Sequence, residues 1–316
     1  MATTMERERV LCTVCGSPDS KEIASGRDYI YHGSDEYFSH VECRRCGHIY
    51  LSPRPKPSEI SVMYPANYGT FSDKFKGRAN LLGAIKQAVN VRRFSSVAGD
   101  ISPGARILDV GCGNGELLRA LAAKRPDLEL YGLDWYFPPE TRRNLEAEGI
   151  RLVEARLEDA PLPAEHFDLI LMYQLIEHLW DPRACLSHLH GALKPGGRIA
   201  IETPNTDGYD RKWFVNGCWG GYYVPRHLNL YNFARLKLFL TECRFEVLAQ
   251  RDLPAPIIWC YSCQAAIQEH FGQGKLLERV FEPRNVAALG CFAACDVLAI
   301  LIGARTSNQQ AVARRR

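Results

Sequence analysis

The stretch "ILDVGCGNGELLRAL", residues 107–121, predicts a strand, a glycine-rich turn and a helix in that order. Its apolar run ends at Asp109, and a helical pattern follows the glycines Gly111, Gly113 and Gly115. Turns of this form bring the backbone amides of a helix start against a nucleotide. We therefore expect a nucleotide-binding sheet, and the carboxylate at the strand end should select the nucleotide.

The alternation of strand and helix patterns continues from Arg106 almost to the end of the chain. Apolar runs of strand length alternate with segments of helical periodicity. This order predicts the α/β class, with a mostly parallel sheet covered by helices on both faces. The expected strands are 106–110, 128–135, 150–155, 167–174, 197–204, 245–253 and 307–316, and the expected helices are 115–124, 138–149, 181–193 and 232–244.

The turn does not fit the common phosphate-bearing nucleotides. The dinucleotide fingerprint requires a glycine where this chain has Glu116, and no Gly-Lys-Ser/Thr of a phosphate-binding loop follows. Asp109, two residues before the first glycine, would place an anion against a pyrophosphate. The site therefore suits a nucleoside that is cationic near the glycines. S-adenosylmethionine fits, because it carries an ammonium and a sulfonium and has no phosphate.

With these motifs the sequence resembles the class I S-adenosylmethionine-dependent methyltransferases. "ILDVGCGNG" matches the first motif of that family, and Asp134 in "YGLDW" matches the acidic residue that binds the ribose hydroxyls. Trp135 would lie against the adenine. "FDLILMYQLIEHLWDP" and "LKPGGRIAIETPN" look like the fourth strand and the turn before the fifth. The resemblance implies a Rossmann-like, seven-stranded, mostly parallel sheet whose last strand is antiparallel.

The resemblance also implies a set of cofactor-binding residues. One departure is visible: the acidic residue that usually meets the adenine amine falls on Arg156, so that the Leu157 amide and Glu158 or Asp159 would have to replace it. Tyr64 and Tyr68 would form a lid over the cofactor, or would pack between domains. The remaining expected cofactor residues are Asp109, Gly111, Cys112, Gly113, Asn114, Gly115, Asp134, Trp135, Leu157, Glu158, Tyr173, Gln174 and His178.

Four of the twelve cysteines form two C-x-x-C-G pairs near the N-terminus. Cys12 and Cys15 form the first pair, and Cys43 and Cys46 form the second. Two tight turns that supply two thiolates each meet the needs of a tetrahedral zinc ion, whereas a redox C-x-x-C normally occurs singly. Because protein atoms fill all four positions, the predicted zinc is structural.

The chain is expected to contain three parts. Residues 1–57 form the zinc module, 58–104 a linker with lid helices, and 105–316 the cofactor-binding domain. An apolar insertion over 254–304, expected to be a helical hairpin, separates the last two strands. Its segment from Val286 to Ala304 approaches membrane-spanning length but contains the charged Asp296. The insertion is therefore either a buried helical pair or an interfacial or lid element that handles an apolar substrate.

Histidines are the expected general bases for methyl transfer to an oxygen or carbon nucleophile. His178 follows the fourth strand at its carboxyl end, and His227 would approach from the other side. Tyr223 is a further catalytic candidate, and Tyr222 a secondary one. The alternative role for His178 is to cap the next helix or to hold the cofactor pocket. The aromatic residues between 213 and 223 would shape the acceptor pocket.

The balance of 39 basic and 36 acidic residues gives a net charge of +3, so a nucleic-acid partner is not expected. The N-terminus has no apolar stretch typical of a signal peptide, and a cytoplasmic location, with peripheral membrane contact as an alternative, is expected. The paired knuckles resemble those of bacterial sugar and natural-product methyltransferases, and "PRHLNLYNFARLKLFL" resembles a segment of quinone-pathway O-methyltransferases. We expect O- or C-methylation of a sugar, a lipid-linked intermediate or a secondary metabolite. The alternatives are an RNA methyltransferase whose zinc module binds RNA and a non-catalytic cofactor-binding partner protein. The oligomeric state is left open.

Overall fold

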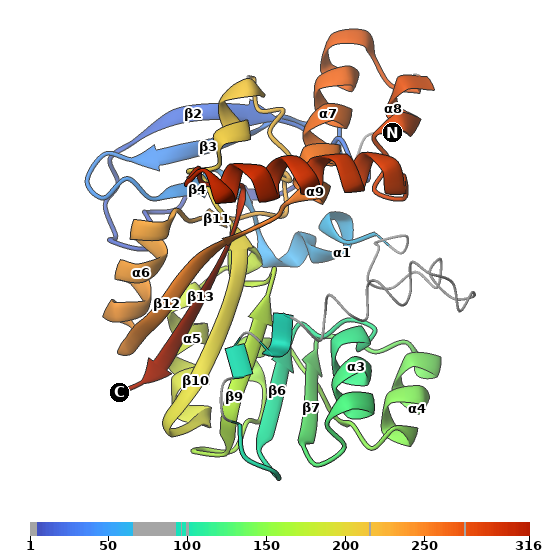
Figure 1. Ribbon diagram of the computed structural model, residues 1–316. Helices are drawn as coiled ribbons and strands as arrows, with labels where there is room; N and C mark the ends of the chain where they lie inside the picture. The colour runs from blue at the N-terminus through green and yellow to red at the C-terminus, as the bar shows by residue number, and fades with distance from the viewer. Residues whose placement is uncertain (1–4, 66–92, 96, 99–100, 215, 275) are drawn as a thin grey trace.

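The computed structural model describes residues 5–65, 93–95, 97–98, 101–214, 216–274 and 276–316 (Figure 1). Tyr68 and most of the linker with lid helices expected over 58–104 lie outside the described residues. The described chain contains a two-stranded, a four-stranded and a seven-stranded sheet. In Figure 1 the seven-stranded sheet occupies the lower part of the molecule, and the four-stranded sheet and the C-terminal helices occupy the upper part.

The seven-stranded sheet confirms the α/β, Rossmann-like class. Its strand order is β12-β13-β10-β9-β6-β7-β8. β10, β9, β6, β7 and β8 run parallel, whereas β13 runs antiparallel to both β10 and β12, as expected for the last strand. The strands are β6 (Arg106–Val110), β7 (Glu129–Asp134), β8 (Arg151–Glu154), β9 (Phe167–Tyr173), β10 (Leu193–Pro204), β12 (Phe245–Leu253) and β13 (Asn308–Arg315).

Helices cover both faces of this sheet because its central strands are apolar on both sides. In β6, Ile107 packs in one buried cluster with helix residues Leu118 and Leu145, while Leu108 packs in the other with Leu186 and others. The helices on the first face are α3 (Glu116–Lys124) and α4 (Pro139–Ala147), and those on the second are α5 (Pro182–Ala192) and α6 (Phe233–Glu242).

Local sequence signals fix where two of these helices begin. Asp181 caps α5 by accepting a hydrogen bond from the Ala184 amide, and Pro182 occupies the first turn. Asn232 caps α6 in the same way through the Arg235 amide. Side-chain caps of this kind satisfy amides that the first helical turn leaves without partners.

The N-terminal segment forms a sheet that the C-terminal half of the chain completes. The order of this sheet is β11-β4-β3-β2, and β11 (Asn229–Leu230) pairs antiparallel with β4 (Ile49–Leu51). A buried ion pair between Asp28 and Arg226, 2.8 Å apart, joins the same two parts of the chain. The other N-terminal elements are β1 (Arg7–Glu8), β2 (Ser20–Gly26), β3 (Phe38–Cys43), β5 (Arg54–Pro55), η1 (Pro57–Glu59) and α1 (Ile60–Met63).

The insertion between β12 and β13 is helical, as expected. It contains α7 (Pro256–Phe271), the short α8 (Leu276–Val280) and α9 (Val286–Leu301), and α7 packs against α9. Asp296 of α9 is buried at this contact, where it accepts hydrogen bonds from the Ala255 amide and the side chains of Trp259 and Tyr209. Of the helices in the described residues, none is both long enough and apolar enough to pass through a bilayer.

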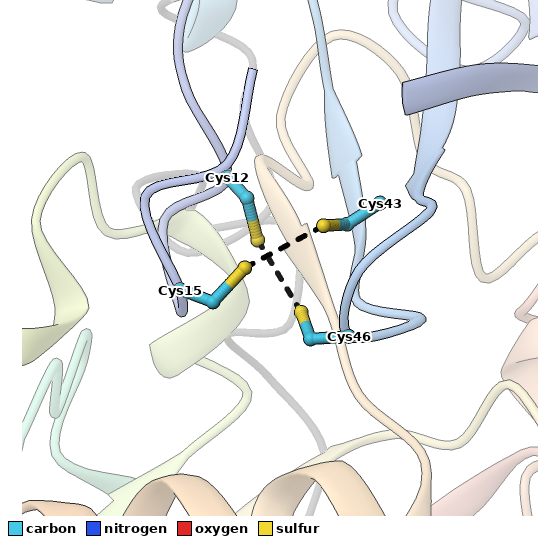
Figure 2. A group of neighbouring side chains, drawn as sticks. All are labelled: Cys12, Cys15, Cys43 and Cys46. Atoms are coloured by element: carbon cyan, nitrogen blue, oxygen red, sulfur yellow. Dashed lines mark hydrogen bonds between the residues drawn. The ribbon is translucent and has the colours of Figure 1, made fainter. Parts of the chain in front are cut away.

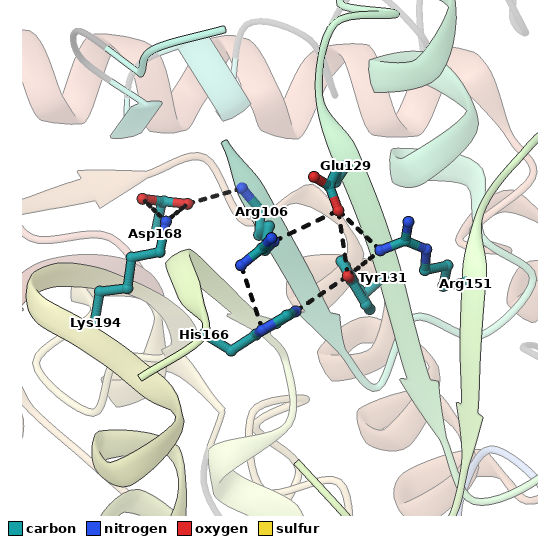
Figure 3. Close-up of polar contacts among 7 residues, drawn as sticks. All are labelled: Arg106, Glu129, Tyr131, Arg151, His166, Asp168 and Lys194. Carbon is teal, nitrogen blue, oxygen red and sulfur yellow. Dashed lines mark hydrogen bonds and ion pairs between the residues drawn. The ribbon is translucent and has the colours of Figure 1, made fainter. Parts of the chain in front are cut away.

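The amino ends of the parallel strands carry a network of charged and polar side chains (Figure 3). Asp168 at the start of β9 accepts hydrogen bonds from the Arg106 amide and from Lys194. Glu129 at the start of β7 pairs with Arg106 at 3.5 Å and with Arg151 at 2.8 Å. Tyr131 and His166 complete the network. Because these charged side chains pair with one another, we assign this network a structural role.

Candidate active site

A pocket of about 860 Å³, partly open to solvent, lies at the carboxyl ends of β6, β7 and β9. Ligands of open α/β sheets bind at this edge. Eight of the expected cofactor residues line it, including Tyr64, which was expected to form a lid, and Arg156 also lines it. The lining residues are Ile60, Tyr64, Gly111, Leu133, Asp134, Trp135, Ala155, Arg156, Leu157, Glu158, Gln174, Leu175, His178, Leu179 and Trp180.

The glycine turn after β6 is fixed by its backbone conformation. Gly111 and Gly115 have φ angles of 74° and 72°, a region that residues with a side chain rarely adopt. Gly115 is also the N-cap of α3, and a Cβ at this position would lie 2.4 Å from Cδ2 of Leu145. The amides of Gly111 and Cys112 both donate to the Leu133 carbonyl of β7. The turn is therefore preformed.

Two buried carboxylates end the neighbouring strands β6 and β7. Asp134 accepts hydrogen bonds from the amides of Gly113 and Trp135, each 2.8 Å long. Burial raises the pKa of Asp134, and burial together with the Asp134 carboxylate raises the pKa of Asp109 to about 7. Two adjacent acids with raised pKa values would be stabilised in their charged form by a cationic ligand. This part of the site thus favours a positively charged nucleoside over one with phosphates.

Arg93 and Glu202 are site residues that the sequence analysis missed. Arg93 forms an ion pair with Glu202, which is fully buried and also accepts a hydrogen bond from Gln310. The guanidinium lies 4.8 Å from the ring centre of Tyr173, and its charge offsets part of the rise in the pKa of Asp109. Arg93 precedes the strand pattern without any motif, so only the tertiary structure places it here.

His178 lies at the border between this pocket and the residues around His227. Its Nδ1 atom lies 2.8 Å from the Tyr64 hydroxyl and 3.2 Å from the Arg226 carbonyl. Both neighbours can accept a hydrogen bond, so a proton on Nδ1 leaves Nε2 able to take a proton from a substrate. His178 also ends η4 (Ile176–His178), whose N-terminal residues are buried.

His227 lies behind His178, with 4.7 Å between the ring centres. Its Nδ1 atom donates to the Gly221 carbonyl at 2.8 Å, which leaves Nε2 as an acceptor 3.9 Å from Glu177. Glu177 is fully buried and accepts a hydrogen bond from Thr203. Burial raises the pKa of Glu177 to about 8 and lowers the pKa of His227 to about 4. Burial also lowers the pKa of His178, so both histidines are neutral near pH 7.

Glu177, His178 and His227 also form a set with the spacing of metal ligands. One side-chain nitrogen or oxygen of each lies within 4.8 Å of the others. Tyr223, the remaining catalytic candidate, packs beside His227 and stacks on Tyr261 of α7 at 5.5 Å between ring centres. Of the three catalytic candidates, His178 lines the pocket, whereas Tyr223 and His227 do not. Tyr222 is buried against Trp219.

The four cysteines of the two predicted knuckles converge (Figure 2). Their sulfur atoms all lie within 4.8 Å of one another, with Cys12 and Cys46 3.6 Å apart and Cys15 and Cys43 3.5 Å apart. Four sulfurs at zinc–sulfur bonds of about 2.3 Å in a tetrahedron would lie ~3.8 Å apart. The two turns have matching geometry, because Gly16 and Gly47 donate to the Cys12 and Cys43 carbonyls, both at 2.8 Å. The four thiols fit a zinc ion.

The cysteine-bearing segment holds the loop that carries His227. The His227 carbonyl lies 3.1 Å from Nε2 of His40 on β3. Asn229 accepts a hydrogen bond of 2.7 Å from Thr13, which lies between the first two cysteines. With the β11–β4 pairing and the Asp28–Arg226 ion pair, these contacts make the position of His227 depend on the N-terminal segment.

Known proteins resemble the chain in sequence and in fold. A ubiquinone biosynthesis O-methyltransferase of Xylella fastidiosa (strain M23) is 34% identical over 132 residues, which cover 37% of this chain and 50% of that protein. That of Salmonella enteritidis PT4 is 32% identical over 117 residues, or 35% of this chain and 47% of the relative. The chain thus spans about half the length of the curated relatives it matches.

Among solved structures, the 1,6-didemethyltoxoflavin-N1-methyltransferase of Burkholderia thailandensis has a TM-score of 0.51 and 15% identity. The similarity covers 85% of this chain and 96% of that one, and supports the fold. The model of the methyltransferase domain family matches residues 84–250, just over half of the chain. The family match includes the glycine turn and the two strand-end carboxylates, Asp109 and Asp134. The chain therefore belongs to the methyltransferase domain family, with the fold of the class I S-adenosylmethionine-dependent methyltransferases.

Proposed function

We propose that this protein transfers a methyl group from S-adenosylmethionine to a small-molecule acceptor. The observation that carries this proposal is the pair of buried carboxylates, Asp109 and Asp134, beside a preformed glycine turn. The carboxylate of Asp134 would accept the ribose hydroxyls, as acidic residues at this strand end do in nucleotide-binding sheets. Trp135 and Leu157 would enclose the adenine. The family membership of the chain supports the same reading.

The residues on the acceptor side would position and deprotonate the nucleophile. When bound, S-adenosylmethionine supplies an activated methyl group, so that alignment of the partners is the main task of the protein. His178 lines the pocket and keeps Nε2 for the proton of an acceptor hydroxyl or acidic carbon. Tyr64 and the Arg226 carbonyl would orient His178, burial and the neighbouring His227 would keep it neutral, and His227 would act as the base for an acceptor entering from its side.

The acceptor is proposed to be a sugar, a lipid-linked intermediate or another secondary metabolite, methylated at oxygen or carbon. The named activity of the Xylella relative, O-methylation in ubiquinone biosynthesis, is compatible with an aromatic or partly apolar acceptor. Tyr223 and Tyr261 stack next to His227 and would line such a site. A structural zinc ion held by Cys12, Cys15, Cys43 and Cys46 is part of the proposal.

Calorimetry with S-adenosylhomocysteine tests the cofactor assignment. We expect binding by the wild-type chain, much weaker binding by Asp134→Ala, and no measurable binding of NAD or ATP. Tight uptake of NAD or ATP without uptake of S-adenosylhomocysteine would refute the proposal. Mass spectrometry of small molecules that co-purify with the S-adenosylhomocysteine complex would then identify the acceptor, and transfer of a labelled methyl group to that compound would establish the activity.

A further inference from the structure

Helix α9 has the reverse of the polarity expected for a surface helix. Its one charged residue, Asp296, points into the protein together with Phe292 and Ala299. The opposite side of the helix is exposed and entirely apolar. We call this side the outer apolar face; its exposed residues are Val286, Ala287, Gly290, Cys291, Ala294, Cys295, Val297, Leu298, Leu301 and Ile302.

The orientation of α9 is fixed by its inward contacts. Asp296 accepts three hydrogen bonds, from the Ala255 amide, Trp259 and Tyr209. Phe292 stacks on Trp259 with 5.1 Å between the ring centres. Rotating the helix to bury Leu298 and Leu301, which are 62% and 75% exposed, would break these contacts and leave a buried carboxylate without donors. The exposure of the apolar side is therefore built into the fold.

The end of α7 and the short helix α8 add further exposed apolar residues. Phe271 of α7 is 67% exposed and Leu276 of α8 is 76% exposed, and Leu277 and Val280 of α8 are also exposed. Exposed apolar side chains that gather on one part of a surface are typical of interaction sites. Figure 1 shows α7, α8 and α9 grouped at the upper end of the molecule, away from the lower part of the seven-stranded sheet.

The charges at this end favour an anionic partner. Arg284 precedes α9 by two residues and Arg279 lies in α8, and both are exposed. Among the nearby acidic residues, Glu278 accepts a hydrogen bond from Gln268 and Glu269 accepts hydrogen bonds from Tyr29 and Tyr37, whereas Glu282 is exposed. Basic residues that border an apolar helix face are typical of elements that lie in the headgroup region of a bilayer.

The outer apolar face of α9 alone is too small for a stable dimer interface. A helix of 16 residues is roughly 24 Å long and ~10 Å wide, so that the outer side of α9 presents on the order of 240 Å². A stable interface buries about 800 Å² per partner. A narrow convex ridge needs a matching groove on a protein, whereas lipid chains adapt to its shape.

We propose that the outer apolar face, with Phe271 and the exposed apolar residues of α8, binds the surface of an anionic phospholipid bilayer without crossing it. The proposal does not depend on the proposed methyl transfer. It has a consequence for that reaction, because α7 connects this surface to the site: Tyr261 of α7 stacks on Tyr223, next to His227. A bound bilayer would lie on the element that borders the acceptor side.

Flotation with vesicles tests the proposal. We expect the full chain to partition onto vesicles of equal parts phosphatidylcholine and phosphatidylglycerol, and less onto phosphatidylcholine alone. The double variant Leu298→Glu/Leu301→Glu should lower partitioning roughly ten-fold or more, since two charges would replace inserted apolar groups. Leu238→Glu, at a 43% exposed leucine of α6, is the matched control and should bind as the wild type does. Arg279→Gln/Arg284→Gln should reduce binding to the anionic vesicles several-fold.

Three results would overturn the proposal. One is the absence of partitioning onto anionic vesicles by the folded wild-type chain, with folding checked by circular dichroism. Another is unchanged partitioning of Leu298→Glu/Leu301→Glu. The third is a stable dimer in sedimentation analysis that the same double variant converts to a monomer, because the face would then be occupied by a second copy. Binding of S-adenosylhomocysteine, measured in parallel, reports on the methyltransferase assignment separately.

Discussion

The two halves of the candidate site are built in different ways. Most of the proposed cofactor half comes from strand ends and loops between Asp109 and Glu158, and its key contacts are backbone amides to the Asp134 carboxylate. The acceptor half brings Tyr64, His178 and His227 together from three separate segments. Cofactor recognition is thus a property of a local unit, whereas the expected chemistry depends on how distant parts of the chain are held.

The two halves also differ in how burial shifts the pKa values of their titratable groups. Burial in the cofactor half raises the pKa of two acids, which a cationic ligand would reverse. Burial in the acceptor half lowers the pKa of both histidines and raises that of Glu177, so the neutral forms dominate near pH 7. The carboxylates of the cofactor half would therefore bind a positive charge, and the neutral histidines of the acceptor half would accept a proton.

Removal of the proposed zinc ion should separate the two halves most sharply. Because the cysteine-bearing segment holds the His227 loop, Cys43→Ala or chelation should lower methyl transfer by ~100-fold or more, while S-adenosylhomocysteine affinity changes only a few-fold. Turnover and calorimetry would measure these effects. Cys291→Ser, at an exposed cysteine outside the cluster, is the control.

Measuring the metal content of the purified protein tests the same link between the N-terminal segment and the acceptor half. We expect about one zinc ion per chain, set by the four thiolate ligands. A second bound metal that is lost in Glu177→Gln would assign the Glu177–His178–His227 cluster to metal binding. Full turnover by a chain stripped of zinc would contradict the link between the N-terminal segment and the acceptor half.

Removal of the bases should affect turnover strongly and cofactor binding little. His178→Ala and His227→Ala should each lower kcat by roughly 10²- to 10⁴-fold if that histidine removes the acceptor proton. His188→Ala, at a histidine that contacts the Ala160 carbonyl instead, is the matched control. If both active-site variants keep full turnover with the true acceptor, the base assignment is wrong.

Loss of the Asp134 carboxylate should weaken cofactor binding, which depends on the other half of the site. Asp134→Ala should weaken S-adenosylhomocysteine binding by about 100-fold, since two hydroxyl bonds to a charged group would be lost. Calorimetry measures the change directly. Asp127→Asn replaces an aspartate that pairs with Arg125 outside the pocket and should bind normally. Normal binding by Asp134→Ala would remove the main support for the cofactor site.

The smallest expected effect is a pH dependence of stability that originates in Glu177. Its folded-state pKa of about 8 lies above the ordinary value of 4.5, so the folded chain binds the proton more tightly. Glu177 therefore favours folding at low pH, and this contribution is lost as the pH rises from about 4.5 through 8. The Tm of Glu177→Gln relative to wild type should increase over that window. A constant difference would show that Glu177 is ionised in the folded chain.

The sequence predicted the parts of the molecule that depend on neighbouring residues. Period and length identified the seven strands, and the β6 prediction matched the observed Arg106–Val110. β10 begins at Leu193, four residues before the expected start, because the "LKPGG" turn joins the ladder with β9. The cofactor-binding assignments remain predictions, but eight of them line one pocket, because seven lie at or after the carboxyl ends of the parallel strands β6, β7, β8 and β9 and Tyr64 reaches it from the N-terminal segment.

Contacts between residues that are far apart in the chain could not be predicted from the sequence. Arg93 and Glu202 are 109 positions apart, and Asp28 and Arg226 are 198 positions apart, yet each pair is an ion pair with at least one buried partner. No periodicity or local motif couples such positions. Glu177 was visible beside His178 in "LIEH", but its burial and raised pKa come only from the packing around it.

The sheet shared by β4 and β11 has a consequence for how the chain is made. During synthesis, β2, β3 and β4 leave the ribosome long before residues 229–230 exist. At translation speeds of about 5–20 residues per second, the open edge of β4 waits roughly 10 to 35 s for its partner strand. An exposed strand edge can recruit another chain during that interval. Early capture of zinc by the two knuckles would order the nascent segment, and metal supply would then govern the yield of correctly assembled protein.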